Sequence, residues 1–115
     1  MDKEEIAGAR IVLKADDWER AVRFYAVLLG RPADATPDFG VALWRIGSGC
    51  ELCVSGNAQK AVNFELLVRD VKAIHDRMKA ELDFEPEGKE SWRFTSTRFY
   101  RDPWGNEVFL RPAKE

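Results

Sequence analysis

The sequence contains few of the side chains on which most enzyme chemistry depends. Histidine occurs once, as His75, so no acid–base pair of histidines can form and only one imidazole is available to a metal. Neither a Ser-His-Asp arrangement nor a Gly-x-Ser-x-Gly motif is present. We expect His75, beside Ile74 in a helical segment, to be a surface or helix-packing residue. The sequence therefore predicts no catalytic residue.

Long apolar runs and an excess of one charge are also missing. The chain has 18 basic and 20 acidic residues, and its net charge is −2. This balance provides no basic surface for nucleic acid or an anionic membrane, and no apolar span of about 18 residues or signal-peptide core occurs. We expect a cytoplasmic protein that binds neither nucleic acid nor membrane. Its 115 residues are predicted to form a single domain.

The two cysteines form a Cys-x-x-Cys pattern that suggests a redox or zinc site. However, Cys50 and Cys53 lie in a segment with the pattern of a strand, where residues three apart point to opposite faces. A redox pair is usually found at a helix N-terminus, and zinc would need two further ligands. We predict two reduced cysteines that are structurally unrelated.

One pattern of secondary structure occurs twice, first at about residues 9–56. Alternating apolar and polar residues over 10–15 predict a half-buried strand. Asp16 is predicted to cap the following helix, with Glu19 completing a capping box, and Gly30 is predicted to end it. The first half therefore begins as a strand followed by an amphipathic helix.

The second half, at about residues 62–112, starts the same pattern again. Residues 63–68 alternate as in a strand, and Asp70 is predicted to cap a helix. Its apolar stripe consists of Val71, Ile74, Met78 and Leu82. A shift that places Asp17 on Asp70 also places Ala15 on Val68. The shared order of strand, acidic cap and helix predicts a duplicated unit.

Further strands follow each helix. Residues 41–46 and 50–54 are joined by Gly47-Ser48-Gly49, which is typical of a hairpin. Residues 92–100 and 107–110 are predicted to be a second pair of strands, joined by a tight turn. With a short, weakly marked strand after each helix, each half is predicted to be a β-α-β-β-β module.

The tight turn has the sequence Asp-Pro-Trp-Gly-Asn at residues 102–106. Proline fixes φ, glycine and asparagine tolerate positive φ, and the aspartate can accept hydrogen bonds from the backbone ahead of it. Together with the Asp-x-x-Glu-Arg-Ala-x-x-Phe-Tyr run at residues 16–25, this turn resembles the vicinal oxygen chelate superfamily. That superfamily includes glyoxalase I, extradiol dioxygenases, and bleomycin- and fosfomycin-resistance proteins. The resemblance covers about residues 9–112.

The resemblance implies an α+β fold in which the two modules form a curved, half-open mixed sheet with helices on its convex side. The apolar strand residues would then pack under the helices. The alternate residues would face the cup: Arg10, Val12, Lys14, Glu51, Cys53, Asn63, Glu65, Leu67, Glu107, Phe109 and Arg111. Such a polar lining suits a ligand or water, and a plain solvated sheet surface is the alternative.

In metal-dependent members of the superfamily, histidine or glutamate on the first and last strand of each module binds a divalent metal. The matching positions in this chain are Arg10, Glu51, Asn63 and Phe109. Only Glu51 keeps a ligand-type side chain, because Arg10 is a permanent cation and Phe109 has no lone pair. The resemblance therefore implies that the metal site has been replaced and that no cofactor is bound.

An ion pair between Arg10 and Glu51 is the predicted replacement. The pair could anchor a ligand at the centre of the cup, or it could only satisfy two buried charges. The aromatic residues Trp44, Trp92 and Trp104, together with Phe109, could stack against a planar ligand. Alternatively, these rings could fill the core or a dimer interface.

Similarity to the bleomycin-resistance type implies a metal-independent protein that binds a small molecule. It would sequester a drug, as in antibiotic resistance, or an aromatic metabolite. A homodimer is expected because a half-open barrel leaves strand edges and a cup wall for a partner to cover. One alternative is a metal-dependent lyase, isomerase or dioxygenase of the same fold, drawing its ligands from Glu51, Glu65, Glu107 and His75. Another is an accessory dimerisation domain without a ligand.

Overall fold

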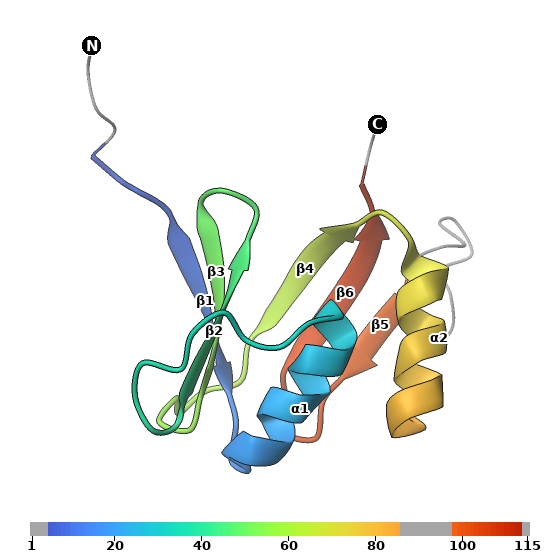
Figure 1. The fold of residues 1–115 in the computed structure, drawn as a ribbon, viewed down its shortest axis with the longest axis horizontal. Helices are drawn as coiled ribbons and strands as arrows, with labels where there is room; N and C mark the ends of the chain where they lie inside the picture. Colours follow the sequence, from blue (N-terminus) through green and yellow to red (C-terminus); the bar gives the residue numbers. More distant parts are fainter. Residues whose placement is uncertain (1–4, 86–97, 114–115) are drawn as a thin grey trace.

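The computed structural model describes residues 5–85 and 98–113, and it has two similar halves (Figure 1). The described elements are β1 (Ala9–Lys14), α1 (Trp18–Leu29), β2 (Val41–Ile46), β3 (Cys50–Ser55), β4 (Asn63–Val68), α2 (Val71–Leu82), β5 (Arg98–Arg101) and β6 (Glu107–Pro112). In each half, a strand and a helix are followed by two further strands. None of the described helices has the length and apolar character needed to span a membrane.

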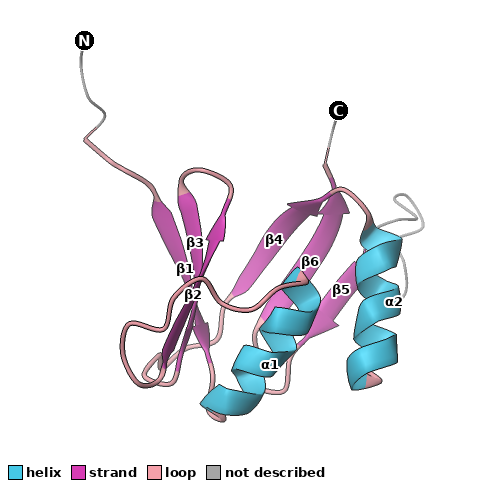
Figure 2. Cartoon of the chain, viewed as in Figure 1, coloured by secondary structure: helices cyan, strands magenta, loops and turns pink. Residues whose placement is uncertain are grey.

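Each half contributes a three-stranded mixed sheet. The strand orders are β1-β3-β2 and β4-β6-β5, and the central strand of each sheet is parallel to one neighbour and antiparallel to the other. The two helices, both of 12 residues, lie side by side and leave the hairpin of β2 and β3 uncovered at one end (Figure 2). This arrangement confirms the predicted α+β fold of two repeated modules, with the strands divided between two small sheets.

The extra strand predicted after each helix is not formed in the first half. A single isolated bridge between Ala35 and Leu43 takes its place. Pro37 follows closely and has no backbone N–H to extend such a pairing. In the second half the corresponding residues lie within 86–97, outside the described part of the chain, together with Trp92.

The N-cap of α1 lies one residue later than predicted. Asp17, and not Asp16, accepts a hydrogen bond from the backbone N of Arg20 at 3.3 Å. The third helical position is therefore Arg20, and the predicted capping box between Asp16 and Glu19 does not form. Asp16 instead pairs with the Nζ of Lys14 at 2.6 Å.

The other helix ends follow the expected chemistry. Asp70 caps α2 by accepting a hydrogen bond from the backbone N of Ala73 at 3.0 Å. Gly30 ends α1 with a φ of 79°, a conformation that suits a residue without a Cβ. Asp83 ends α2 with a φ of 52°. The predictions for Asp70 and Gly30 are confirmed.

The described core is a hydrophobic cluster that includes both helices and strands from both halves. Its largest fully buried members are Trp44, Tyr25, Tyr100, Leu13, Leu28, Leu52, Met78 and Leu110. Burying each of these aliphatic or aromatic side chains contributes about 1.5–3 kcal/mol. The strand residues predicted to face the helices all belong to this cluster or pack against it. The alternation in the sequence therefore identifies the core face correctly.

The turn at residues 102–106 joins the two halves through Asn106, which is fully buried. Its Nδ2 donates to the carbonyl of Lys14 at 2.7 Å, and its Oδ1 accepts from the backbone N of Lys14 at 3.2 Å. The same Oδ1 accepts from the backbone N of Val62 at 3.1 Å. One side chain therefore ties the end of β1 to the residue that precedes β4.

Asp102 holds this turn in place. Its carboxylate accepts hydrogen bonds from the Tyr25 hydroxyl at 2.6 Å, the Trp104 backbone N at 2.9 Å and the Asn106 Nδ2 at 2.8 Å. Burial, followed by the negative charge of Asp102, raises the pKa of Tyr25 well above its ordinary value. We call Tyr25, Asp102 and Asn106, with the backbone of Lys14 and Val62, the junction network. It connects α1, β1, the turn and the start of the second half.

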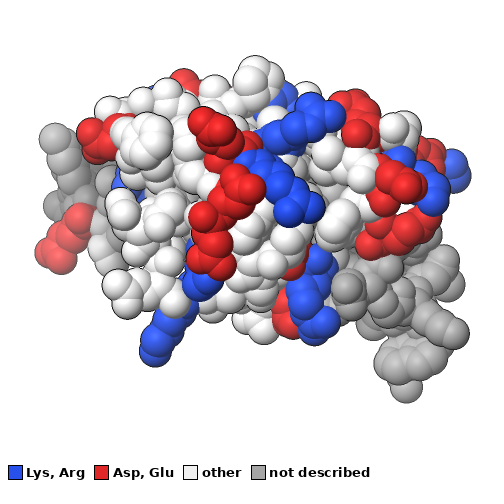
Figure 3. Space-filling model, turned by 90° about the horizontal axis from the view of Figure 1, so that it is seen from below, with Lys and Arg blue, Asp and Glu red and all other residues white. Residues whose placement is uncertain are grey.

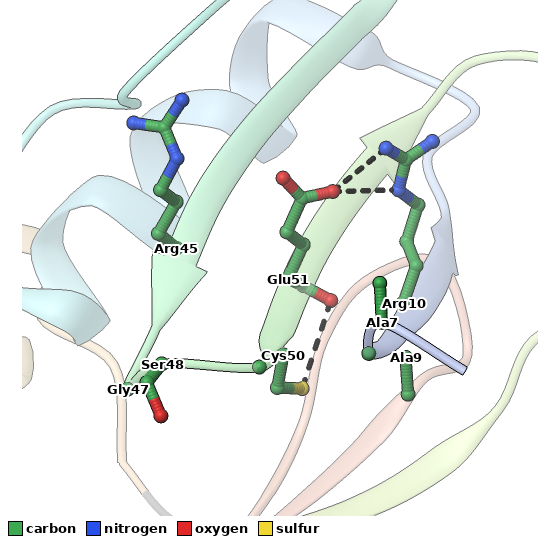
Figure 4. Close-up of a pocket in the computed structure, with 10 residues that line it drawn as sticks. Ala7, Ala9, Arg10, Arg45, Gly47, Ser48, Cys50 and Glu51 are labelled. Carbon is green, nitrogen blue, oxygen red and sulfur yellow. Dashed lines mark hydrogen bonds and ion pairs between the residues drawn. The ribbon is translucent and has the colours of Figure 1, made fainter. Parts of the chain in front are cut away.

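Cys50 and Cys53 form no disulfide in the described structure. Cys53 is buried, whereas Cys50 is half-buried and its Sγ donates a weak hydrogen bond to the carbonyl of Glu51 at 3.9 Å (Figure 4). Burial raises the pKa of the Cys53 thiol.

On the face seen in Figure 3, acidic and basic side chains of the described residues are interspersed.

Candidate functional site

A charged row crosses the first sheet on the face opposite the core. Strand pairing places Arg10 of β1 beside Glu51 of β3, and Glu51 beside Arg45 of β2. The three side chains extend in the same direction from neighbouring strands (Figure 4). We call these three residues the groove row. The next row along the strands includes Val12, which is 40% exposed, so charged and apolar surfaces adjoin each other.

Arg10 and Glu51 form the predicted ion pair. Both Nε and Nη2 of Arg10 donate to the same oxygen of Glu51, Oε1, at 2.9 and 2.7 Å. This hydrogen-bonded carboxylate raises the pKa of Arg10. The side chains are 52% and 31% exposed, so the expectation of two buried charges is wrong for the described chain. The pair is partly exposed because it lies on the face of the first sheet that is opposite the core.

This row forms the floor of an open groove of about 510 Å³. The backbone before β1 and the hairpin turn between β2 and β3 supply its edges (Figure 4). Its lining consists of Ala7, Gly8, Ala9, Arg10, Arg45, Gly47, Ser48, Gly49, Cys50 and Glu51. Small residues at the edges leave the three long polar side chains as the main functional groups. The groove therefore offers charge at its floor and little steric obstruction at its mouth.

Arg45 is held by its backbone and not by its side chain. Its backbone N donates to Asp34 Oδ2 at 2.6 Å, and its carbonyl accepts from Arg31 Nη2 at 2.5 Å. Arg31 and Asp34 also pair with each other at 2.7 Å. The hydrogen bond from Arg31 and the one from the Arg45 backbone lower the pKa of Asp34. These contacts fix the edge strand β2, from which the Arg45 side chain extends to line the groove.

The matching position on the second sheet has a different composition. Asn63 is exposed and lies opposite Glu107 on β6, as Arg10 lies opposite Glu51 on the first sheet. Glu107 pairs with Arg101 of β5 at 2.8 Å. The strand pairing thus relates Glu107, and not Phe109, to the position of Glu51.

Phe109 lies two residues further along β6, opposite Glu65. It is half-buried, and its neighbour Glu65 pairs with Arg111 at 2.8 Å. The predicted residues Asn63 and Phe109 therefore share the second sheet, whereas Arg10 and Glu51 meet on the first.

The residues at the superfamily's metal positions do not fit a divalent ion. Such ions need several converging oxygen or imidazole ligands. The strand pairing adds Glu107 to Glu51 as a carboxylate at the related positions, and each of the two already accepts two hydrogen bonds from an arginine, Arg101 or Arg10. The described part of the chain contains no cluster of three or more His, Cys, Asp or Glu residues with metal-site geometry.

The tryptophans do not line the groove as predicted. Trp44 is fully buried in the core, where its Nε1 donates to the carbonyl of Arg31 at 3.0 Å, so its assignment to the pocket is wrong. It points inward because it lies opposite Leu52 on the core side of β3. Trp104 is 7% exposed and packs edge-on against Phe24, on the helix side of the strands. Trp92 lies outside the described residues.

Arg45 was missing from the set of site residues that the sequence suggested. The signal was available, because Trp44 is the apolar residue of an alternating strand and Arg45 must then point the other way. The pairing of β2 with β3, which sets Arg45 beside Glu51, could not be derived from alternation alone.

No protein-family model matches the sequence, and no curated protein matches it. Solved structures do match. A glyoxalase/bleomycin resistance protein from Catenulispora acidiphila DSM 44928 has a TM-score of 0.74 at 22% identity, covering 96% of this chain and 100% of that chain. A lactoylglutathione lyase from Agrobacterium tumefaciens has a TM-score of 0.68 at 22% identity, covering 94% of each chain.

A third match is the oxidase ChaP-H2, with a TM-score of 0.62 at 18% identity, covering 97% of this chain and 98% of that chain. These likenesses show that the chain has the glyoxalase/bleomycin-resistance fold. Because the matched structures include a lyase and an oxidase, the fold alone does not select one activity.

Proposed function

On the glyoxalase/bleomycin-resistance fold, we propose that this chain is a metal-independent protein that binds a small molecule in the groove beside Arg10 and Glu51. The observation that carries the proposal is the Arg10–Glu51 pair at a position where the superfamily's enzymes hold a metal ligand. A permanently charged guanidinium competes with a cation for the carboxylate. The groove then offers hydrogen bonds and charge in place of a Lewis acid.

The remaining hydrogen-bonding capacity of the pair supports a binding role. Arg10 uses Nε and Nη2 on Glu51, which leaves Nη1 as a donor, and Glu51 Oε2 is an acceptor that Arg10 does not use. A ligand with a matching acceptor and donor can therefore be oriented without breaking the pair. The apolar row that includes Val12 would contact the rest of the ligand.

The size of the groove also suits this role, since small-molecule sites usually measure about 300–1,000 Å³. The groove, at about 510 Å³, would admit a drug-sized or metabolite-sized compound. We further propose that a second copy of the chain covers the exposed apolar residues of the cup face, Val12 and Leu67, and thereby closes the site in a cytoplasmic homodimer. The bound molecule would be sequestered and not converted.

A thermal-shift screen tests this proposal. Protein dialysed against EDTA would be screened with neutral and charged ring compounds, since a ligand at 100 times its Kd adds about 2.7 kcal/mol to the unfolding free energy. We expect some compounds to raise Tm without added metal. The double variant Arg10→Met/Glu51→Gln should lose these shifts.

The matched control is Glu65→Gln/Arg111→Met, which removes an ion pair of similar exposure from the second sheet. It should keep the shifts. Stabilisation that appears only after a divalent ion is added would contradict metal independence. Shifts that persist in the Arg10→Met/Glu51→Gln variant would place the ligand elsewhere.

A further inference from the structure

We propose that the groove selects a ligand carrying an oxyanion, such as a carboxylate or a phosphate, and that Arg45 is the residue that binds this group. The inference rests on the proposed small-molecule function and assigns the chemical class of the ligand. It follows from the charges around the groove, from the way Arg45 is held and from the lack of a competing partner for its guanidinium.

The charges of the groove do not balance. Three guanidinium groups, those of Arg10, Arg31 and Arg45, lie in or beside it with two carboxylates, Glu51 and Asp34. Glu51 pairs with Arg10 at 2.7 Å, and Asp34 pairs with Arg31 at 2.7 Å. Each carboxylate is therefore neutralised by another arginine, and the charge of Arg45 remains.

The guanidinium of Arg45 makes no hydrogen bond or ion pair within the described part of the chain, although its charge helps to lower the pKa of Asp34. Glu51 is its neighbour across the strands, but this carboxylate turns toward Arg10 (Figure 4). The donors of Arg45 are thus available to a ligand. A planar guanidinium fits a carboxylate or phosphate through two parallel hydrogen bonds.

Arg45 is also positioned in advance. The hydrogen bond that its backbone N donates to Asp34 and the one that its carbonyl accepts from Arg31 fix the edge strand from which the side chain extends. A fixed backbone reduces the conformational freedom that an incoming anion must remove. The second sheet differs, because its Arg101 and Arg111 both pair with glutamates. Among the described side chains of the strands, the unpaired guanidinium of Arg45 thus distinguishes the first sheet from the second.

Four compounds with the same ring test the inference: benzoate, phenyl phosphate, benzamide and benzylamine. Each would be titrated into ¹⁵N-labelled protein at constant ionic strength, with the signals of the Arg45 side chain and of residues 47–49 as the readout. We expect benzoate or phenyl phosphate, or both, to bind roughly tenfold or more tightly than benzamide, because a hydrogen bond to a charged group adds about 1.5–3 kcal/mol. Benzylamine should bind most weakly.

In Arg45→Gln, the affinity for the anions should fall to that for benzamide. Arg69→Gln is the matched control, since it removes another exposed arginine, at the end of the second module's first strand. It should leave the affinities unchanged. Tighter binding of phenyl phosphate than of benzoate would identify the oxyanion as a phosphate, and the reverse would identify it as a carboxylate.

Equal binding of benzoate, phenyl phosphate and benzamide, no binding of either anion, or anion binding that survives in Arg45→Gln would overturn the inference. None of these results would by itself remove the proposed function. Neutral compounds that stabilise the metal-free protein through Arg10 and Glu51 would still support that function.

Discussion

The molecule contains two polar clusters that differ in burial and in hydrogen bonding. In the junction network, the buried Asp102 and Asn106 direct their polar atoms at the backbone, at each other and at Tyr25. In the groove row, Glu51 is only partly buried and Arg45 is exposed with its guanidinium unpaired in the described structure. Buried and satisfied groups stabilise a fold, whereas exposed and unsatisfied groups remain available to a ligand. The comparison assigns stability to the first cluster and binding to the second.

The largest effect should follow from Asn106→Ala. This change removes the hydrogen bonds to Lys14, Val62 and Asp102 and leaves backbone groups at the junction without partners. We expect a loss of roughly 3–5 kcal/mol in the free energy of unfolding, measured by urea denaturation. The control Asn63→Ala removes an exposed asparagine and should change little. Equal effects of the two substitutions would remove the distinction between the clusters.

Tyr25→Phe should have a smaller effect. It deletes the hydroxyl that donates to Asp102 at 2.6 Å and keeps the buried ring. We expect a loss of about 1.5–3 kcal/mol near neutral pH, the usual range for a hydrogen bond to a charged group.

This loss should depend on pH. The folded-state pKa of Tyr25 is raised, so the stability it contributes is fully present below the unfolded-state pKa of about 10 and is lost as pH rises through the folded-state value. The difference in unfolding free energy between wild type and Tyr25→Phe should therefore shrink above about pH 10. A difference that stays constant from pH 8 to pH 11 would be evidence against a protonated Tyr25 hydroxyl as the donor.

Substitutions in the groove row should affect stability still less. Arg10→Met, Glu51→Gln and their combination alter an open-face ion pair that solvent screens. In urea denaturation, each should lower the unfolding free energy by less than Tyr25→Phe does. If Arg10→Met proved as destabilising as Asn106→Ala, the pair would have to be buried in solution, and the contrast between the two clusters would fail.

The smallest expected effect is that of metal removal. Since Arg10 and Asn63 stand where ligands would be needed, and Glu51 and Glu107 are both paired with arginines, EDTA should leave Tm unchanged, and elemental analysis should find less than one tightly held divalent ion per chain. A decrease in Tm that nickel, zinc or manganese reverses would instead indicate a metal site.

The sequence predicted the fold well because the alternation and the turn chemistry are local. The strand faces, the caps at Asp70 and Gly30 and the turn at residues 102–106 each depend on residues close in the chain. The prediction that Asp16 caps α1 was wrong because two aspartates are adjacent, and local sequence rules do not choose between them. In the structure Asp17 caps the helix, and Asp16 pairs with Lys14.

The site was only partly predictable because it depends on pairing between strands. The resemblance brought Arg10 and Glu51 together, and the structure confirms their contact. Exposure could not be inferred in the same way, so a pair of two buried charges stayed open as one of two alternatives. Trp44 was assigned to the pocket because it is aromatic, although the alternation of β2 places it in the core. Its neighbour Arg45 is the residue that the sequence analysis overlooked.

The most direct test of the account is a map of where small molecules bind to chelator-treated protein. ¹⁵N–¹H spectra would be recorded with each compound that raises Tm in the screen. The account predicts shifts at Arg10, Glu51 and the turn at residues 47–49. Shifts confined to the groove beside Val22 and Ala26 of α1 or to the pocket at Trp104, or shifts at the predicted site only after a divalent ion is added, would contradict it.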